Sequence, residues 1–161
     1  MTPTHTAALH VARDSFAMLR QTLDRLPVEA LDWSPAPGVM NPLGVLIVHS
    51  LTASQFLIGL GCGRMTSLTE YRAGERAASF ASKGLTVSTL LTKVDTMETV
   101  IANLLESGTE AHLAAWIDYP EDASFAKSGV QCVIHGVAHL REHVGHAQAL
   151  HDLWLAGAAK G

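Results

Sequence analysis

The chain has 161 residues and a mass of 17.1 kDa, and we expect a single domain over residues 1–161. The 11 basic and 15 acidic residues give a formal net charge of −4, which argues against a nucleic-acid-binding protein. Hydrophobic residues make up 48% of the chain and charged residues only 16%, so the sequence can bury a sizeable core and is not disordered.

Hydrophobic residues recur at helical spacing in four long segments, of which the first runs from about His5 to Leu26. Pro27 follows it, and the prolines at 35 and 37 exclude regular structure until about Pro42. Pro42 suits the first turn of a second helix, which we expect to end near Leu60, where three glycines supply stop signals.

Residues 62–84 are small and polar and contain three glycines, so we expect a long loop there, with room for a short turn of helix. The third helix is predicted from about Thr86 to Ser107, with Thr86 as its cap and Gly108 as its stop.

The fourth helix is predicted from about Val130 to Leu155, after a mixed connection over residues 109–129. Within that connection, Glu110–Ile117 is long enough for one or two helical turns. No strand-like alternation of useful length is present. Four helices joined by two long connections predict an all-α four-helix bundle.

The second helix lies in a stretch, residues 34–63, that contains no charged side chain. A membrane-spanning helix needs about 20 mostly apolar residues. Polar side chains that are costly in lipid interrupt this run in its middle: His49, Ser50, Thr52, Ser54 and Gln55. We interpret the segment as a buried helix of a soluble bundle.

The cysteines and the start of the chain predict a cytoplasmic protein. Two cysteines, Cys62 and Cys132, are too few for a disulfide scaffold and suit a reducing compartment. Residues 1–5 lack the basic start and the apolar stretch of a secretory signal.

Histidine is unusually frequent, with nine residues, and four of them share one face of the last predicted helix. At about 100° per residue, these four fall within an arc of about 80°, whereas His151 points elsewhere. Histidines four residues apart present both imidazoles to one ion, so successive pairs of this stripe are candidate metal-ligand pairs. The stripe alone leaves a hydrogen-bonded or solvated face as the alternative. Its members are His135, His139, His143 and His146.

A metal site on this stripe needs a ligand from elsewhere, because catalytic sites usually combine three protein ligands with an open position. His49 is the best candidate, since it lies in the charge-free second helix, where an isolated imidazole would be poorly satisfied. His5, His10 and His112 are expected to be solvated.

Other metal and nucleophile motifs are absent from the sequence. No Glu-x-x-His is present, which excludes the ferritin-like di-iron pattern, and neither His-Glu-x-x-His nor Cys-x-x-Cys occurs. Gly61-Cys62-Gly63 resembles a flexible turn, and Cys132 is expected to pack in the core one turn from His135. For Arg72 and Glu75 we favour a solvated loop face over a position at the mouth of the site.

Several segments resemble the DinB-like/YfiT-like superfamily. Leu31–Gly38 and Asn41–His49 are similar to its opening, in which a proline-bearing loop precedes a helix with a single histidine. Arg72–Gly84 is similar to the inter-helix loop of one branch. The last helix, from His135 to Trp154, is similar to that branch's closing motif, and the likeness covers nearly the whole chain.

This resemblance implies an up-down-down-up four-helix bundle, often dimeric, that holds a divalent ion, with zinc or nickel ahead of iron or manganese. It carries the family's ligands onto His49, His139 and His143. His135 and His146 flank them as groups that orient the ligands or shuttle protons, or that pack polar atoms under the site. The mycothiol-dependent maleylpyruvate isomerases, a related branch, have glutamate where this chain has His139, and a neutral ligand makes the site more positive.

Our first hypothesis is a metal-dependent enzyme that acts through metal-bound water or a low-molecular-weight thiol, as an S-transferase, an isomerase or a hydrolase. The expected partners are an unidentified small-molecule substrate and a second copy of the chain in a homodimer, with no nucleic acid and no membrane. One alternative is a metal-binding stress or sensor protein without turnover. Another is a bundle whose histidine stripe lines a dimer interface and makes assembly pH-dependent.

Overall fold

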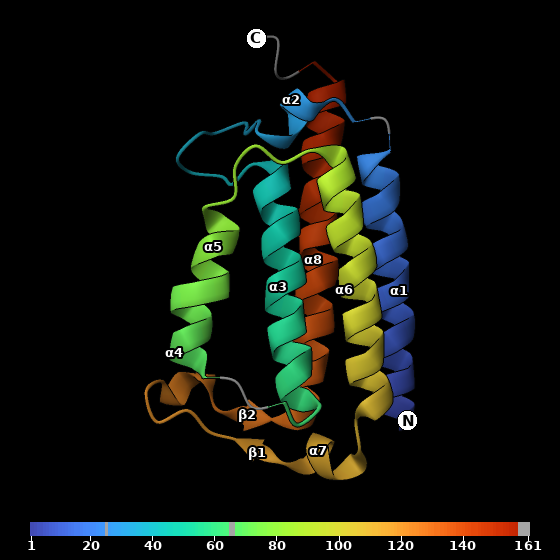
Figure 1. The fold of residues 1–161 in the computed structure, drawn as a ribbon, viewed down its shortest axis with the longest axis vertical. Helices are drawn as coiled ribbons and strands as arrows, with labels where there is room; N and C mark the ends of the chain where they lie inside the picture. The colour runs from blue at the N-terminus through green and yellow to red at the C-terminus, as the bar shows by residue number, and fades with distance from the viewer. Residues whose placement is uncertain (25, 65–66, 158–161) are drawn as a thin grey trace.

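The computed structural model describes residues 1–24, 26–64 and 67–157. Helices α1 and α8 run in one direction and helices α3 and α6 in the other, so the bundle is all-α with an up-down-down-up order, which confirms the predicted fold class (Figure 1). The four long helices are α1 (Pro3–Leu23), α3 (Leu43–Gly61), α6 (Val87–Ser107) and α8 (Gly129–Leu155).

Shorter elements occupy the connections between the long helices. They are α2 (Val28–Leu31), α4 (Leu68–Tyr71), the π-helical turn η1 (Arg72–Arg76), α5 (Ala77–Phe80), α7 (Glu110–Ala114), β1 (Trp116–Ile117), the 3₁₀ turn η2 (Ala123–Phe125) and β2 (Lys127–Ser128). The two short strands pair antiparallel, with Trp116 opposite Ser128, at the end of the bundle where α8 begins.

The caps set the boundaries of the long helices close to the predicted positions. Thr86 caps α6 by accepting a hydrogen bond from the Thr89 amide, and Gly108 ends the helix. Ser128 caps α8 in the same way, and the helix begins at Gly129, one residue before the predicted start. α1 ends three residues before the predicted Leu26, and the short helix α2 was not predicted.

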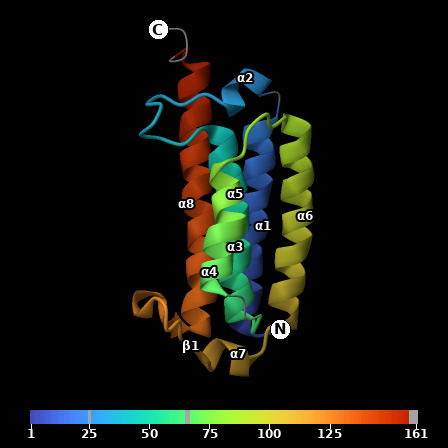
Figure 2. The ribbon, with the colours of Figure 1, turned by 60° about the vertical axis from the view of Figure 1, so that its left-hand side comes forward.

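The prediction of a long loop over residues 62–84 is wrong for most of its described part. α4, η1 and α5 follow one another without a break from Leu68 to Phe80, and we call this stretch the α4–α5 segment. Ser67 caps its start by accepting from the Glu70 amide, and Leu68 and Tyr71 are buried against the bundle. It lies along α3 (Figures 1 and 2). The sequence did not predict these helical turns, because the segment has too few buried apolar residues for a helical period to be visible.

Helix α3 is the core helix of the bundle. Among the described residues it alone is long and apolar enough to cross a membrane, but 89% of its most apolar stretch is buried inside the molecule. Partners on several sides, namely α8, α6 and the α4–α5 segment, bury it. This burial is typical of the core helix of a soluble protein and agrees with our interpretation of the charge-free stretch.

Helices α3 and α8 approach each other closely at two glycines. A Cβ atom at Gly136 would lie 2.7 Å from Ile58 Cγ1 and 3.1 Å from Leu57 Cβ. A Cβ at Gly61 would lie 2.5 Å from the carbonyl oxygen of Gly129. Neither position has space for a side chain, so the glycines permit the short distance between the two backbones.

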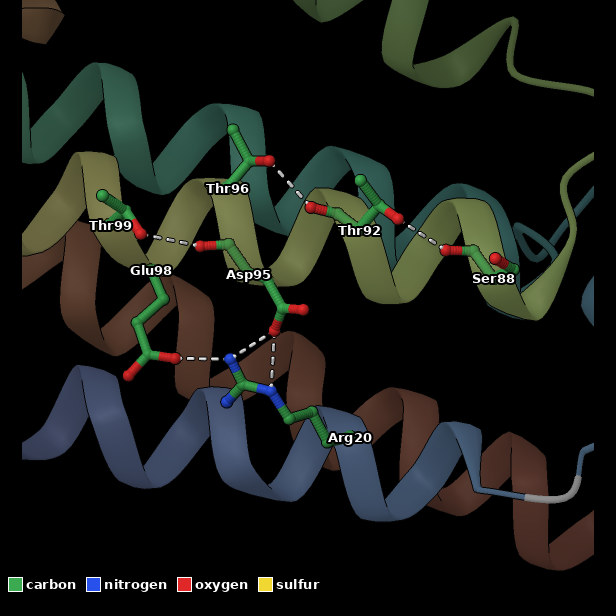
Figure 3. Close-up of polar contacts among 7 residues, drawn as sticks. All are labelled: Arg20, Ser88, Thr92, Asp95, Thr96, Glu98 and Thr99. Atoms are coloured by element: carbon green, nitrogen blue, oxygen red, sulfur yellow. Dashed lines mark hydrogen bonds and ion pairs between the residues drawn. The ribbon is translucent and has the colours of Figure 1, made fainter.

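The outer contact between α1 and α6 is polar. Arg20 forms ion pairs with Asp95 at 2.7 Å and with Glu98 at 2.5 Å (Figure 3). Both pairs are at least partly exposed, so each is worth about 0–1 kcal/mol. Threonine hydroxyls along α6 donate to carbonyl oxygens one turn earlier: Thr92 to Ser88, Thr96 to Thr92 and Thr99 to Asp95.

His5 is fully buried, so the expectation of a solvated side chain is wrong. Thr2 caps α1 and accepts from the His5 amide, which starts the helix early enough to place His5 on its inner face. The Thr2 hydroxyl also lies 2.9 Å from His5 Nδ1, whereas Nε2 has no partner among the described residues. His10, one turn further along, is exposed as predicted.

We expect His5 to contribute to acid sensitivity. Burial lowers the pKa of His5 below the ordinary value of 6.5. Glu110 acts in the opposite direction, whereas the terminal amine and His112 lower the pKa further. The unfolded chain therefore binds more protons as the pH falls below about 6.5, and the free energy of unfolding decreases. In chelator-treated protein, urea midpoints at about pH 7 and about pH 5 should differ less for His5→Gln than for wild type. His10→Gln should keep the wild-type difference, and equal differences in all three proteins would refute this role.

Candidate metal centre

Three imidazoles from two helices converge in the interior of the bundle. His49 comes from α3, and His139 and His143 come from successive turns of α8. The ring centroids of His139 and His143 are 4.4 Å apart, and that of His49 lies 5.2 Å and 5.3 Å from them. One ring nitrogen from each residue lies within 4.8 Å of the other two, an arrangement that no other histidine, cysteine or acidic group shares in the described part of the chain.

Burial keeps these imidazoles neutral near pH 7. His49 is only 8% exposed, and the other two are half-buried. Loss of solvation lowers the pKa of His49 to about 4 and that of His139 to about 3, and neighbouring imidazoles add to both effects. Loss of solvation also lowers the pKa of His143. A neutral imidazole has a free lone pair, which is the form that binds a metal.

The α4–α5 segment orients His49. The Phe80 ring lies 4.3 Å from the His49 ring, and the Ser79 hydroxyl lies 3.5 Å from His49 Nδ1. Ser79 itself is buried and donates to the Arg76 carbonyl. Sequence reasoning missed both residues, because they lie in the stretch that was interpreted as a loop.

The donor set fits a transition-metal ion. Three neutral imidazole nitrogens suit zinc, nickel, copper or iron, whereas calcium and magnesium prefer oxygen ligands. The buried Nδ1 of His139 has no hydrogen-bond partner among the described residues, and an unpartnered buried polar atom is costly. A bound cation would offset part of the cost of burying this nitrogen and of packing three imidazoles together.

The other two histidines of the stripe lie beside this group and outside it. His146 is exposed, with Nδ1 3.3 Å from Nδ1 of His143. His135 is also exposed, and its ring centroid is 6.4 Å from that of His139. Their role in orienting ligands or moving protons stays a prediction. His151 contacts Asp152 and points elsewhere, as expected.

Two further side chains depart from their predicted surroundings. His112 is half-buried rather than solvated, and its Nδ1 is buried without a partner among the described residues. Cys62 lies in a turn where α3 ends, as predicted, but its side chain is buried there, and burial raises its pKa to about 11. Cys132 is fully buried in the core, as expected, with a raised pKa. Neither thiol is present as a thiolate at neutral pH.

A cavity of about 210 Å³ opens beside His49 and His139, whereas His143 does not line it. A groove of about 280 Å³ between α3 and α6 is larger, but it includes none of the clustered histidines. The lining of the smaller cavity combines imidazoles with aromatic and aliphatic walls and one arginine. It consists of His49, Ala53, Phe56, Leu57, Tyr71, Arg76, Phe125, His135 and His139.

Neither loop residue considered from the sequence reaches this cavity. Arg72 pairs with Asp122 at 2.6 Å, and Glu75 lines a separate groove with Arg64. Arg76, which the sequence did not single out, lines the cavity instead. No signal in the sequence distinguishes Arg76 from its neighbours.

The DinB superfamily model matches residues 12–147 of the chain. The chain belongs to the DinB superfamily. Comparison with curated proteins gives no match. The DinB resemblance seen in the sequence is thereby confirmed.

Among solved structures, this DinB protein is similar to the crystal structure of the mycothiol-dependent maleylpyruvate isomerase, with a TM-score of 0.62 and 15% identity. It is also similar to a histidine-to-alanine mutant of that isomerase, with a TM-score of 0.60 and 14% identity. Each alignment covers 89% of this chain and 62% of the other, so this chain spans less than two thirds of the isomerase's length. At identities this low, the structural similarity shows that the fold is shared and nothing beyond the fold.

Proposed function

We propose that this DinB protein is a divalent-metal-dependent enzyme in which His49, His139 and His143 hold the ion. The convergence of three neutral imidazoles, one buried and two half-buried, next to a cavity lined by His49 and His139 carries this proposal. Structural stability alone would be served better by apolar side chains, because buried polar groups without partners are costly. A site with three protein ligands also leaves a position open for a reactant.

A divalent ion at such a site would lower the pKa of water or of a thiol that occupies the open position. The chain's own residues supply the surroundings. Ser79 and Phe80 hold the His49 ring in place, and the Phe56, Tyr71 and Phe125 rings exclude water from one side. Burial raises the pKa of Tyr71 to about 12, so its hydroxyl remains a hydrogen-bond donor.

The reactant that we propose for the open position is a low-molecular-weight thiol. The protein's own thiols are buried and protonated, so a sulfur nucleophile must come from outside. The shared fold with a mycothiol-dependent isomerase supports this class of co-substrate. The reaction would be an S-transfer or isomerisation, or a hydrolysis if water takes the position. Zinc or nickel is the proposed metal, and a cytoplasmic homodimer is the proposed form.

One observation favours a metal-binding stress or sensor protein without turnover as the second candidate. The described residues that line the cavity include no carboxylate, so the site has no acidic general base. The dimer-interface alternative has less support, because His139 and His143 contact His49 inside the bundle rather than a free surface.

We expect protein purified without a histidine tag to bind about one zinc or nickel ion per chain. In cobalt-substituted protein, mycothiol, bacillithiol, glutathione or coenzyme A should add a sulfur-to-cobalt charge-transfer band. Thiol consumption with an electrophile would then identify an enzyme. A charge-transfer band without consumption of any tested thiol would favour the sensor. Substoichiometric metal in wild type would contradict both.

A further inference from the structure

Arg76 occupies an unusual position above the candidate metal centre. It is the last residue of the π-helical turn η1, a rare geometry that is frequent at functional sites. Its guanidinium carbon lies 4.9 Å from the centroid of the Phe80 ring, which in turn lies 4.3 Å from His49. The guanidinium is exposed, lines the cavity and forms no ion pair or hydrogen bond with any described side chain.

A second cation lies at the rim of the same cavity. Lys127 Nζ lies 4.5 Å from the centroid of the Phe125 ring and 3.4 Å from His135 Nδ1, and both of these residues line the cavity. No described carboxylate pairs with Lys127. Together with Arg76 it makes the mouth of the cavity positive, and a divalent ion would add to this charge.

None of the acidic groups nearby lines the cavity. Asp122 is occupied by Arg72, at 2.6 Å. Glu75 lies in the groove that Arg64 lines, and Glu142 is exposed on α8. The cavity therefore offers charge to an incoming anion and no competing carboxylate from its described lining residues.

The remaining walls are apolar and flat. The Phe56 and Tyr71 rings stack with centroids 3.9 Å apart and an interplanar angle of 4°, and Phe125 lies 6.0 Å from Phe56. The Tyr71 hydroxyl makes no hydrogen bond to any described residue. A volume of about 210 Å³ equals about seven water molecules, which suits a small organic molecule and not a peptide.

We propose that this cavity binds a small organic carboxylate, with its charged end on Arg76 and its apolar body against Phe56, Tyr71 and Phe125. This inference rests on the proposed function, because two of the proposed metal ligands, His49 and His139, line the cavity, and it names the class of the second substrate. Arginine suits the role, since its planar fork binds a carboxylate through two hydrogen bonds. Lys127 would attract the anion without such a fork.

Benzoate and its neutral isostere benzamide test this proposal by calorimetric titration of metal-free and zinc-loaded protein. Wild type should bind benzoate in both forms and benzamide more weakly. Arg76→Gln should weaken benzoate binding about fivefold or more, and Arg76→Lys should recover part of the loss. Arg64→Gln, which removes the same charge from the neighbouring groove, is the matched control and should change affinity by less than about twofold.

Equal benzoate affinities in Arg76→Gln and Arg64→Gln would overturn the inference, as would equal binding of benzamide and benzoate or no benzoate binding to wild type. Benzoate binding to the zinc-loaded protein but not to the metal-free protein would mean that the metal binds the carboxylate, and this result would also overturn the inference. Zinc stoichiometry, measured in the same variants, tests the proposed function separately. If the protein does not bind zinc, the effect of Arg76 on benzoate binding can still be measured in metal-free protein. Failure of the proposed function and failure of the carboxylate site are therefore distinguishable.

Discussion

Replacement of His139 by alanine is expected to lower the affinity for zinc by more than about a hundredfold. Substitutions of groups that only support a metal ligand typically cost 10- to 100-fold, as an order of magnitude, so loss of a ligand should cost more. The His139 ring is one corner of a triangle of three imidazoles, 4.4 Å from His143 and 5.2 Å from His49 by ring centroids. Competition titration with a chromophoric chelator measures the change.

His151→Ala is the matched control for this experiment. It removes an imidazole from the same helix, at a residue whose ring contacts Asp152 and lies outside the cluster. Its zinc affinity should equal that of wild type, and His49→Ala should behave as His139→Ala does. Wild-type affinity in His139→Ala, with an unchanged circular dichroism spectrum, would mean that the ion binds elsewhere.

Gly136→Ala is expected to destabilise the fold by about 1–3 kcal/mol, as overpacking of a close-packed core does. A Cβ there would lie 2.7 Å from Ile58 Cγ1 and 3.1 Å from the Ile58 backbone nitrogen. The backbone cannot move aside as a flexible side chain can, so α3 and α8 must separate. Because His49 and His139 lie on these two helices, zinc affinity should fall together with stability.

Gly145→Ala on the same helix provides the control, since its Cβ would meet nothing within 4 Å. Alanine favours a helix over glycine by roughly 0.5–1 kcal/mol, so this variant should be as stable as wild type or more so. Urea unfolding of chelator-treated protein gives both free energies. A Gly136→Ala protein as stable as Gly145→Ala would show that the helices are free to move apart at this point.

The long helices were predictable because their apolar residues repeat with the helical period. Proline and glycine also marked their ends, as at Pro42 and Gly108. The α4–α5 segment was not predictable in this way, since Leu68 and Tyr71 are too few to form a pattern. His5 was misjudged because its burial depends on a helix that begins at Pro3, almost at the chain end.

The candidate site was predictable to a different degree for each residue. The shared face of His139 and His143 follows from spacing alone, whereas their proximity to His49 requires that α3 and α8 be neighbours. The position of Arg76 depends on the π-helical turn, which rotates the residues after it relative to an α-helix. Spacing rules for regular helices therefore could not place it.

The connectivity of the bundle also has a consequence for the growing polypeptide. His49 is separated from His139 and His143 by more than half the length of the chain, and α6 is synthesised between them. A nascent chain that has emerged from the ribosome only as far as α6 carries one of the three imidazoles. Capture of the ion would thus wait until α8 has been synthesised, and it would tie together two helices that lie far apart in the sequence.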